Sequence, residues 1–278
     1  MNGFLHHVVL NGDLVEATAA RISPLGDGFS YGLGVFETVR VLRGRPVFFA
    51  DHFARLQRSA RELGLAFATM AEELGGRCAR CLAANQLEDG GLKIAVFQDA
   101  AGIGELISAR AAAYLPVHYE KGFALKTFST SRHDRGLSQL KTLNYLENLR
   151  ARRAAQAAGG DEALFVGADR RVLEGAASNV FVVKGGKIFT PPADGRILPG
   201  IARGQVLRIL EGGRAHESAI EASALFEAEE IFVTSALLGV MPVAAVDEKR
   251  YDLARNPVTR SLMAAVRLRQ LESVEKTV

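Results

Sequence analysis

One lysine stands in a sequence context that favours a reactive amine. Lys141 lies in the stretch 138–146, whose other residues are apolar or neutral, and the nearest acidic residue is Glu147. Partial desolvation lowers the pKa of a lysine and leaves its amine free for Schiff-base chemistry. The alternative is a lysine whose ammonium reaches solvent from a half-buried segment. The residues around Lys141 leave both interpretations open.

Three further segments could hold an anionic or basic group. Residues 198–203, LPGIAR, place a Pro-Gly turn directly before a predicted helix, and the first N–H groups of such a helix suit a phosphate. Residues 234–237, TSAL, follow a predicted strand and could add hydroxyl or amide donors. Glu174 is a lone carboxylate in a loop of small residues, where it is either functional or a solvated turn residue. A reactive lysine, a phosphate site and a carboxylate are together what pyridoxal phosphate requires.

Other kinds of chemistry find no support in the motifs. The sequence has no G-x-x-x-x-G-K-[ST], no H-E-x-x-H and no G-x-S-x-G. Residues 32–34 (GLG) match the start of the dinucleotide-binding fingerprint G-x-G-x-x-G, but Glu37 stands at its third glycine. They also precede a predicted strand rather than a helix, so a Rossmann site is not supported. Cys78 and Cys81 lack a second pair of zinc ligands and fall inside a helical pattern, so we interpret them as ordinary helix cysteines. The scattered histidines are interpreted as satisfied or solvated, and no metal site is predicted.

The elements that position these residues alternate between strands and helices. Residues 7–10 and 14–16 form a predicted hairpin around Asn11-Gly12, and 35–42 with 46–49 form a second one. Asp51 is the predicted N-cap of a helix that ends at Gly64. Further helices are predicted over 70–87, 144–158, 200–212 and 257–271, and further strands over 92–98, 108–115, 123–129, 163–166, 179–183, 231–234 and 243–246. The fold class is α/β or α+β.

Composition places the chain among ordinary globular proteins. Of its 278 residues, 48% are hydrophobic and 23% charged, which excludes a disordered chain and a coiled coil. A net charge of +3 provides no electrostatic footprint for nucleic acid or an anionic membrane. The longest charge-free run, 231–246, is shorter than the roughly 20 residues that span a bilayer. With no basic leader at the start, we expect a cytoplasmic protein.

The length predicts two domains, at about 150 residues per domain. We expect a smaller N-terminal α/β domain over 1–118, a linker over 119–125 and a larger C-terminal domain over 126–278.

Six blocks, in this order along the chain, resemble the class IV aminotransferases. They are residues 31–37 (YGLGVFE), 52–56 (HFARL), 140–145 (LKTLNY), 174–181 (EGAASNVF), 198–203 (LPGIAR) and 232–235 (FVTS) with 241–243 (MPV). These are fold-type IV pyridoxal-phosphate enzymes, and they include branched-chain and D-amino acid aminotransferases and 4-amino-4-deoxychorismate lyases. The resemblance, from about residue 9 to residue 246, implies a two-domain architecture like that of D-amino acid aminotransferase, with the cofactor between the domains. It also implies a homodimer in which the partner chain closes the active site.

The resemblance assigns cofactor contacts residue by residue. Lys141 matches the Schiff-base lysine, which also transfers a proton. Glu174 matches the carboxylate that pairs with the pyridine nitrogen, and Arg55 matches the arginine that binds the phosphate. Other positions that match cofactor contacts are Leu198, which packs on the ring, the backbone amides of Ile201 and Ala202, and Asn179, Ser235 and Ala236.

The same resemblance implies the substrate positions. Tyr31, Phe36 and Tyr145 fall where the family lines its substrate pocket or the cofactor edge. Lys93 lies close to where branched-chain enzymes place an arginine. The chain departs from the family at Ala202, where a threonine is common, and at residues 236–237, which offer only backbone N–H groups. Residues 93–99 also lack the Arg-Gly pair of the family and the Arg-x-His of the D-amino acid enzymes.

These positions imply a reaction through an external aldimine and a quinonoid, with Lys141 transferring the proton. Residues 34–40, 141–144 and 235–242 are most similar to the lyases, which release pyruvate and 4-aminobenzoate in folate biosynthesis. The alternatives are an aminotransferase for branched-chain or D-amino acids and a pyridoxal-phosphate-binding protein without turnover. The expected ligand in each case is a small amine, with no nucleic acid and no membrane.

Overall fold

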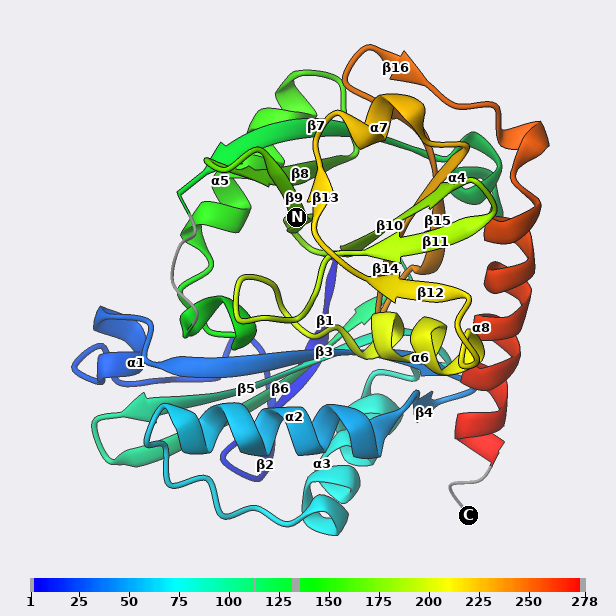
Figure 1. The fold of residues 1–278 in the computed structure, drawn as a ribbon. Helices are drawn as coiled ribbons and strands as arrows, with labels where there is room; N and C mark the ends of the chain where they lie inside the picture. Colours follow the sequence, from blue (N-terminus) through cyan, green and yellow to red (C-terminus); the bar gives the residue numbers. More distant parts are fainter. Residues whose placement is uncertain (1–2, 113, 132–135, 276–278) are drawn as a thin grey trace. The chain divides into compact units, whose positions relative to one another are not determined.

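The computed structural model describes residues 3–112, 114–131 and 136–275. The chain forms two units (Figure 1). Unit 1 consists of residues 1–113, 140–144 and 270–278, and unit 2 consists of residues 114–139 and 145–269.

Unit 1 is built on a six-stranded antiparallel sheet with the order β2-β1-β6-β5-β3-β4. Its strands are β1 (Phe4–Leu10), β2 (Asp13–Glu16), β3 (Gly34–Leu42), β4 (Arg45–Pro46), β5 (Asp89–Asp99) and β6 (Gly102–Ala111). The predicted first hairpin is confirmed, with Asn11 at φ 50° and Gly12 at φ 92°. A two-residue hairpin turn needs positive φ at both positions, which Asn-Gly adopts readily.

Helices α2 (Phe49–Glu62) and α3 (Ala71–Ala84) lie against this sheet, and the short α1 (Asp27–Ser30) precedes β3 (Figure 1). Side chains from one face of the sheet, such as Val39 and Ile94, pack against Leu56 of α2 and Leu74 of α3. Cys78 and Cys81 are free thiols in the same core, as the sequence predicted. Burial raises the pKa of both thiols, to about 11 for Cys81, so neither is a ready thiolate.

Unit 2 is built on a mixed sheet with the order β12-β11-β10-β14-β15-β7-β8-β9-β13, and β16 pairs with β15. Its strands are β7 (Phe123–Thr130), β8 (Glu162–Gly167), β9 (Arg171–Gly175), β10 (Asn179–Lys184), β11 (Lys187–Thr190), β12 (Ala215–Glu217), β13 (Ile220–Glu221), β14 (Glu230–Ser235), β15 (Gly239–Val246) and β16 (Lys249–Arg250). The rings of Phe181 and Phe232 stack between β10 and β14 with centroids 4.8 Å apart. Glu174, which the sequence placed in a loop, lies in β9 one residue before its end, because the strand pairing continues to Gly175, and Asn179 begins β10. Thr234 and Ser235 are the last residues of β14.

The α-helices that begin in unit 2 are α4 (Pro116–Lys121), α5 (Leu146–Ala157), α6 (Ile201–Ile209), α7 (Ala224–Glu227) and α8 (Pro257–Glu275). Two 3₁₀ turns, η1 (Leu137–Gln139) and η2 (Leu253–Arg255), complete the described elements. The start of α8 is capped from the sheet, because Glu230 accepts the N–H groups of Val258 (3.0 Å) and Thr259 (2.8 Å).

The predicted second hairpin and the N-cap at Asp51 are wrong in detail. The return strand β4 contains only two residues, and α2 begins at Phe49, with Phe48 as N-cap in the left-handed region at φ 51°. Phe49 and Phe53 stack four residues apart on α2 (centroids 6.3 Å), and both pack on the core of unit 1. This packing extends the helix toward its N-terminus beyond the cap that local chemistry favours. The end of α2 at Gly64, with φ 70°, is confirmed.

The structure also divides the chain differently from the predicted 1–118, 119–125 and 126–278. The expected linker is occupied by α4 and the start of β7. Residues 140–144 return to unit 1, where Thr142 bridges to Val35 of β3. The chain end does the same, and Val274 packs on Leu42 and Val47. Such returns depend on long-range packing, so a contiguous division of the sequence misses them.

Candidate active site

Two predicted site residues of unit 1, Lys141 and Lys93, contact the aromatic ring of a third, Phe36. The ammonium of Lys141 lies 4.5 Å from the centroid of the Phe36 ring, and that of Lys93 lies 4.7 Å from the same centroid. Lys93 pairs in register with Thr38, and alternate residues of a strand share a face, so Phe36 and Lys93 point to the same face of the sheet. A cation within about 6 Å of a ring is attracted to its face. Unit 1 therefore gathers two amines on one ring.

The backbone around Lys141 is tied to β3. The N–H of Phe36 donates to the carbonyl of Lys141 (2.8 Å), and the N–H of Leu143 donates to the carbonyl of Gly34 (2.9 Å). A Cβ on Gly34 would lie 2.8 Å from the backbone carbonyl oxygen of Val96 in β5, which cannot move aside as a side chain can, so this position requires glycine. The lysine is thus held at a fixed place beside β3, although it lies about a hundred residues further along the chain.

Lys93 is partly buried in this arrangement. Burial lowers its pKa, and the nearby charge of Arg110 lowers it further. An anionic ligand would favour the charged form again, because an opposite charge close to an amine restores its protonation.

A buried ion triad lies on the opposite face of β3. Glu37 follows Phe36, so its side chain points the other way, toward α2. Arg55 donates to both carboxylate oxygens of Glu37, from Nε to Oε1 and from Nη2 to Oε2, each at 2.7 Å. His52 Nδ1 lies 2.7 Å from the same Oε2. The exposed fractions are 1% for Glu37, 2% for His52 and 4% for Arg55.

The triad keeps Glu37 ionised. Burial alone would raise the pKa of this carboxyl, but the charge and hydrogen bonds of Arg55, with help from His52, lower it from 4.5 to about 2. Sequence reasoning singled out Arg55 and missed both partners. A signal was present: Glu37 is the lone carboxylate in the apolar strand pattern 35–42, and a buried charge needs a partner. His52, three residues before Arg55, lies on the same face of α2.

Unit 2 brings three other predicted residues together. Glu174 and Asn179 are 6% and 5% exposed and stand on either side of the turn between β9 and β10. The backbone N–H of Leu198 donates to Glu174 Oε2 (3.0 Å), and the Asn179 amide lies 3.3 Å from the same oxygen. Asn179 Nδ2 also donates to the carbonyl of Leu198 (2.8 Å). A carboxylate held in this way can keep a proton on an adjacent ring nitrogen.

The LPG turn leads into α6 as predicted. Gly200 is the N-cap, and no side chain caps the helix. A Cβ on Gly200 would lie 2.0 Å from Asn179 Oδ1, so a larger residue at this position would displace the Asn179 amide. Ile201 and Ala202 are the first two residues of α6. Their N–H groups belong to the first helical turn, where an anion is favoured by the helix dipole.

The turn after β14 offers further donors. The hydroxyl of Thr234 is buried and has no hydrogen-bond partner in the described part of the chain. Ser235 Oγ accepts the N–H of Leu238 (3.3 Å), which shapes the turn that contains Ala236. Tyr119 of α4 donates to the carbonyl of Leu238 (2.9 Å) and holds the turn from the other side.

The remaining predicted residues are placed elsewhere. The Tyr145 hydroxyl donates to the carbonyl of Ala176 (2.6 Å), and the Asn148 amide donates to the same oxygen (2.7 Å). Both therefore support the loop that follows Glu174. Tyr31 is 74% exposed at the end of α1.

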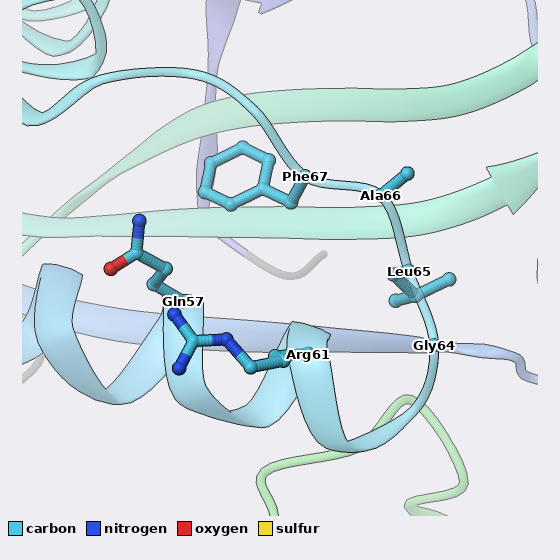
Figure 2. A pocket seen from close by; sticks show the side chains of 6 residues that line it. All are labelled: Gln57, Arg61, Gly64, Leu65, Ala66 and Phe67. Atoms are coloured by element: carbon cyan, nitrogen blue, oxygen red, sulfur yellow. The ribbon is translucent and has the colours of Figure 1, made fainter.

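A separate surface hollow of about 300 Å³ contains none of the predicted residues. It lies at the end of α2 and on the following loop, where Gln57 and Arg61 face the loop that carries Phe67 (Figure 2). Among residues 3–112, 114–131 and 136–275, no group of three His, Cys, Asp or Glu side chains is placed to hold a metal ion. None of the described helices is both long and apolar enough to cross a membrane.

Comparison with known proteins shows which family the chain belongs to. The sequence model of the family described as amino-transferase class IV matches residues 34–246. The chain belongs to the class IV aminotransferases. It is 31% identical to the D-alanine aminotransferase of Bacillus licheniformis, over 98% of this chain and 99% of that protein. It is 29% identical to the aminodeoxychorismate lyase of Bacillus subtilis, over 92% of each chain.

A solved structure supports the same fold. The branched-chain aminotransferase of the thermophilic archaeon Thermoproteus uzoniensis, solved with norvaline, superposes with a TM-score of 0.88 at 28% identity, covering 99% of this chain and 97% of that one. The predicted α/β architecture of fold-type IV is therefore confirmed. Class IV aminotransferases are enzymes that use pyridoxal phosphate, so this member of the family is an enzyme with that cofactor.

Proposed function

We propose that the chain binds pyridoxal 5'-phosphate, with Lys141 as the amine that bonds to it. The observation that carries this proposal is the placement of Lys141, whose backbone is tied to β3 and whose ammonium meets Phe36. The match of the family's sequence model to residues 34–246, which include Lys141, supports the same assignment.

The donors and charges present fit a phosphorylated aromatic aldehyde. A buried carboxylate, Glu174, suits a protonated ring nitrogen. The start of α6, without a side-chain cap, suits the phosphate dianion. The buried Thr234 hydroxyl, which has no partner in the described part of the chain, is a further donor for an anion. Together with Lys141 for the aldehyde, these features correspond to the ring nitrogen and the phosphate of the cofactor.

When bound, pyridoxal phosphate supplies an aldehyde that condenses with an amine and a ring that accepts electrons from the adjacent carbon. Lys141 would hold the aldehyde through its amine and would move the proton at the substrate carbon. Glu174 would keep the ring nitrogen protonated. Arg55 and the backbone N–H groups of Ile201 and Ala202 would bind the phosphate.

We further propose that the reaction is that of 4-amino-4-deoxychorismate lyase. The substrate is an amine with two carboxylates, and Lys93 provides a cation beside Lys141 that can attract one of them. Removal of the proton from the amine-bearing carbon by Lys141 allows the carbon–oxygen bond at the neighbouring ring carbon to break, and the ring becomes 4-aminobenzoate. The departing enolpyruvate takes up a proton and becomes pyruvate. The relation to the lyase of Bacillus subtilis supports this reaction.

Amino transfer is the second candidate. The relation to the D-alanine and branched-chain aminotransferases favours it, and Lys93 would then attract a carboxylate of the amino acid. The two reactions differ in one requirement, because transfer needs a keto-acid acceptor and elimination does not.

The deciding experiment supplies 4-amino-4-deoxychorismate without a keto acid and measures pyruvate and 4-aminobenzoate. Equimolar release by the wild type, lost in Lys141→Ala, is the expected result. If no product forms but D-amino or branched-chain amino acids transfer their amino group to added keto acids, the lyase assignment is wrong. A protein that binds the cofactor and turns over none of these amines would be a binding protein.

A second copy of the chain completes the proposal. Leu25, Phe29 and Tyr31 are 83%, 65% and 74% exposed around α1, and such an apolar group suits an interface. We expect a homodimer by sedimentation, and conversion to monomers by charged substitutions at Leu25 and Phe29.

A further inference from the structure

The buried pair Glu37 and His52 has no part in the function proposed so far. We propose that both are positioning residues, which fix the Arg55 guanidinium for the phosphate of the cofactor. This inference rests on the proposed function, because it takes Arg55 as a phosphate ligand.

The geometry of the guanidinium allows Arg55 to bind the Glu37 carboxylate and a phosphate through different N–H groups. Arginine has five N–H groups arranged in planar forks. Glu37 receives one N–H from Nε and one from Nη2, each at 2.7 Å. Two bonds from one planar group to one planar carboxylate fix the orientation of both. The end-on fork of Nη1 and Nη2 then has a fixed direction, and its spacing matches two phosphate oxygens.

His52 holds the carboxylate itself in place. It lies three residues before Arg55 on α2, and its Nδ1 is 2.7 Å from the Glu37 oxygen that also receives Arg55 Nη2. Because two residues of one helix form hydrogen bonds with the same carboxylate, the Glu37 side chain is kept oriented toward Arg55. All three side chains are almost fully buried, so water does not compete for these bonds.

β3 ties this triad to the reactive lysine. Glu37 directly follows Phe36, whose N–H donates to the Lys141 carbonyl (2.8 Å). Arg55 and Lys141 are therefore fixed to neighbouring residues of one strand. In the proposed function these two side chains bind different ends of the cofactor, its phosphate and its aldehyde. The link runs through the backbone of β3, because Phe36 and Glu37 point to opposite faces of the strand.

Charge alone makes the opposite prediction. A carboxylate next to a phosphate-binding arginine repels the phosphate, so its neutralisation in Glu37→Gln would tighten the binding of pyridoxal phosphate. If position is what matters, the same change loosens Arg55 and weakens binding. Glu37→Asp keeps the charge but shortens the side chain, so it weakens binding only in the positioning account.

The test measures dissociation constants of pyridoxal phosphate and of pyridoxal, which lacks the phosphate, on cofactor-free full-length enzyme. We expect Glu37→Gln and Glu37→Asp to reduce the preference for the phosphorylated ligand by at least about 10-fold. His52→Gln, which leaves the Glu37–Arg55 pair intact, should reduce it less, and pyridoxal affinity should change little in all three. Glu105→Gln is the matched control, because Glu105 is a buried carboxylate of unit 1 that pairs with Arg77 at 2.9 Å.

An unchanged or increased preference in the Glu37 variants would overturn the proposal. Equal losses for both ligands would do the same, because they would indicate a structural role only. Arg55→Gln separates this outcome from failure of the proposed function. If that variant keeps the wild-type preference, Arg55 does not bind the phosphate; if it loses the preference and the Glu37 variants do not, only the positioning role is wrong. Should Glu37→Gln fail to fold, Glu37→Asp and His52→Gln provide the same comparison.

Discussion

Glu162 is a buried carboxyl of unit 2 whose titration should be visible in stability. It is the first residue of β8 and is 3% exposed. Burial raises its pKa from 4.5 to about 7, although the charge of Arg152 and nearby backbone N–H groups act in the opposite direction. The N–H of Ala163 donates to its Oε1 (3.1 Å). The perturbation we choose is Glu162→Gln, which keeps the shape and removes the titrating proton.

The magnitude follows from the interval between the two pKa values. Between pH 4.5 and about 7, the folded protein holds a proton at Glu162 that the unfolded chain releases. Stability is then fully present below pH 4.5 and falls as the pH rises through this interval. At about 1.4 kcal/mol per pH unit, the wild type loses about 3 kcal/mol over this range. Glu162→Gln avoids this loss, so its advantage over the wild type should grow with pH by the same amount.

Denaturant unfolding of cofactor-free protein, followed from about pH 5 to about pH 8, measures this difference. Glu248→Gln is the control, because that side chain is 97% exposed and should unfold as the wild type does throughout. If the difference between Glu162→Gln and the wild type stays constant with pH, burial does not control this carboxyl and the reasoning is wrong.

Three further outcomes are expected. Glu37→Gln should lower the free energy of unfolding near neutral pH by about 3 kcal/mol. This deficit should disappear as the pH falls from 4.5 toward 2, because the lowered pKa of Glu37 stabilises the fold only above that range. A deficit independent of pH in unfolding experiments would contradict this reasoning. Glu230→Ala should cost about 2 kcal/mol by removing the acceptor for two N–H groups at the start of α8, and unchanged unfolding would show that this cap contributes nothing. Lys93→Met removes a cation beside Lys141, so it should raise the KM for the substrate about 10-fold or more and leave the affinity for the cofactor unchanged. An unchanged KM would show that Lys93 does not bind the substrate.

Local structure was largely predictable from the sequence. The Asn11-Gly12 turn, the end of α2 at Gly64 and the Pro-Gly entry into α6 are all present, because turn and cap residues act over a few positions. The start of α2 was not predicted correctly, because the packing of Phe49 on the core outweighed the preference of Asp51 for the N-cap position.

The candidate site was predictable only where short motifs carry it. Lys141 and Glu174 were singled out by their immediate context, which left their roles open, and the resemblance to the family then assigned these roles. The contacts of Glu174 with Asn179 and Leu198 join the β9–β10 connection and one turn, so they are short-range. Lys93 was proposed from its likeness to family members. The structure brings it to the same ring as Lys141, and its role remains a prediction.

The sequence by itself determined the elements and the family, because periodicity, turn residues and the order of motifs are properties of neighbouring residues. Only the tertiary structure decided that residues 140–144 return to β3 and that Arg55 grips Glu37 with His52 beside it. These contacts join different elements, and alternation along β3 sends Phe36 to one face and Glu37 to the other. The burial that makes both contacts strong exists only after the helices have packed on the sheet.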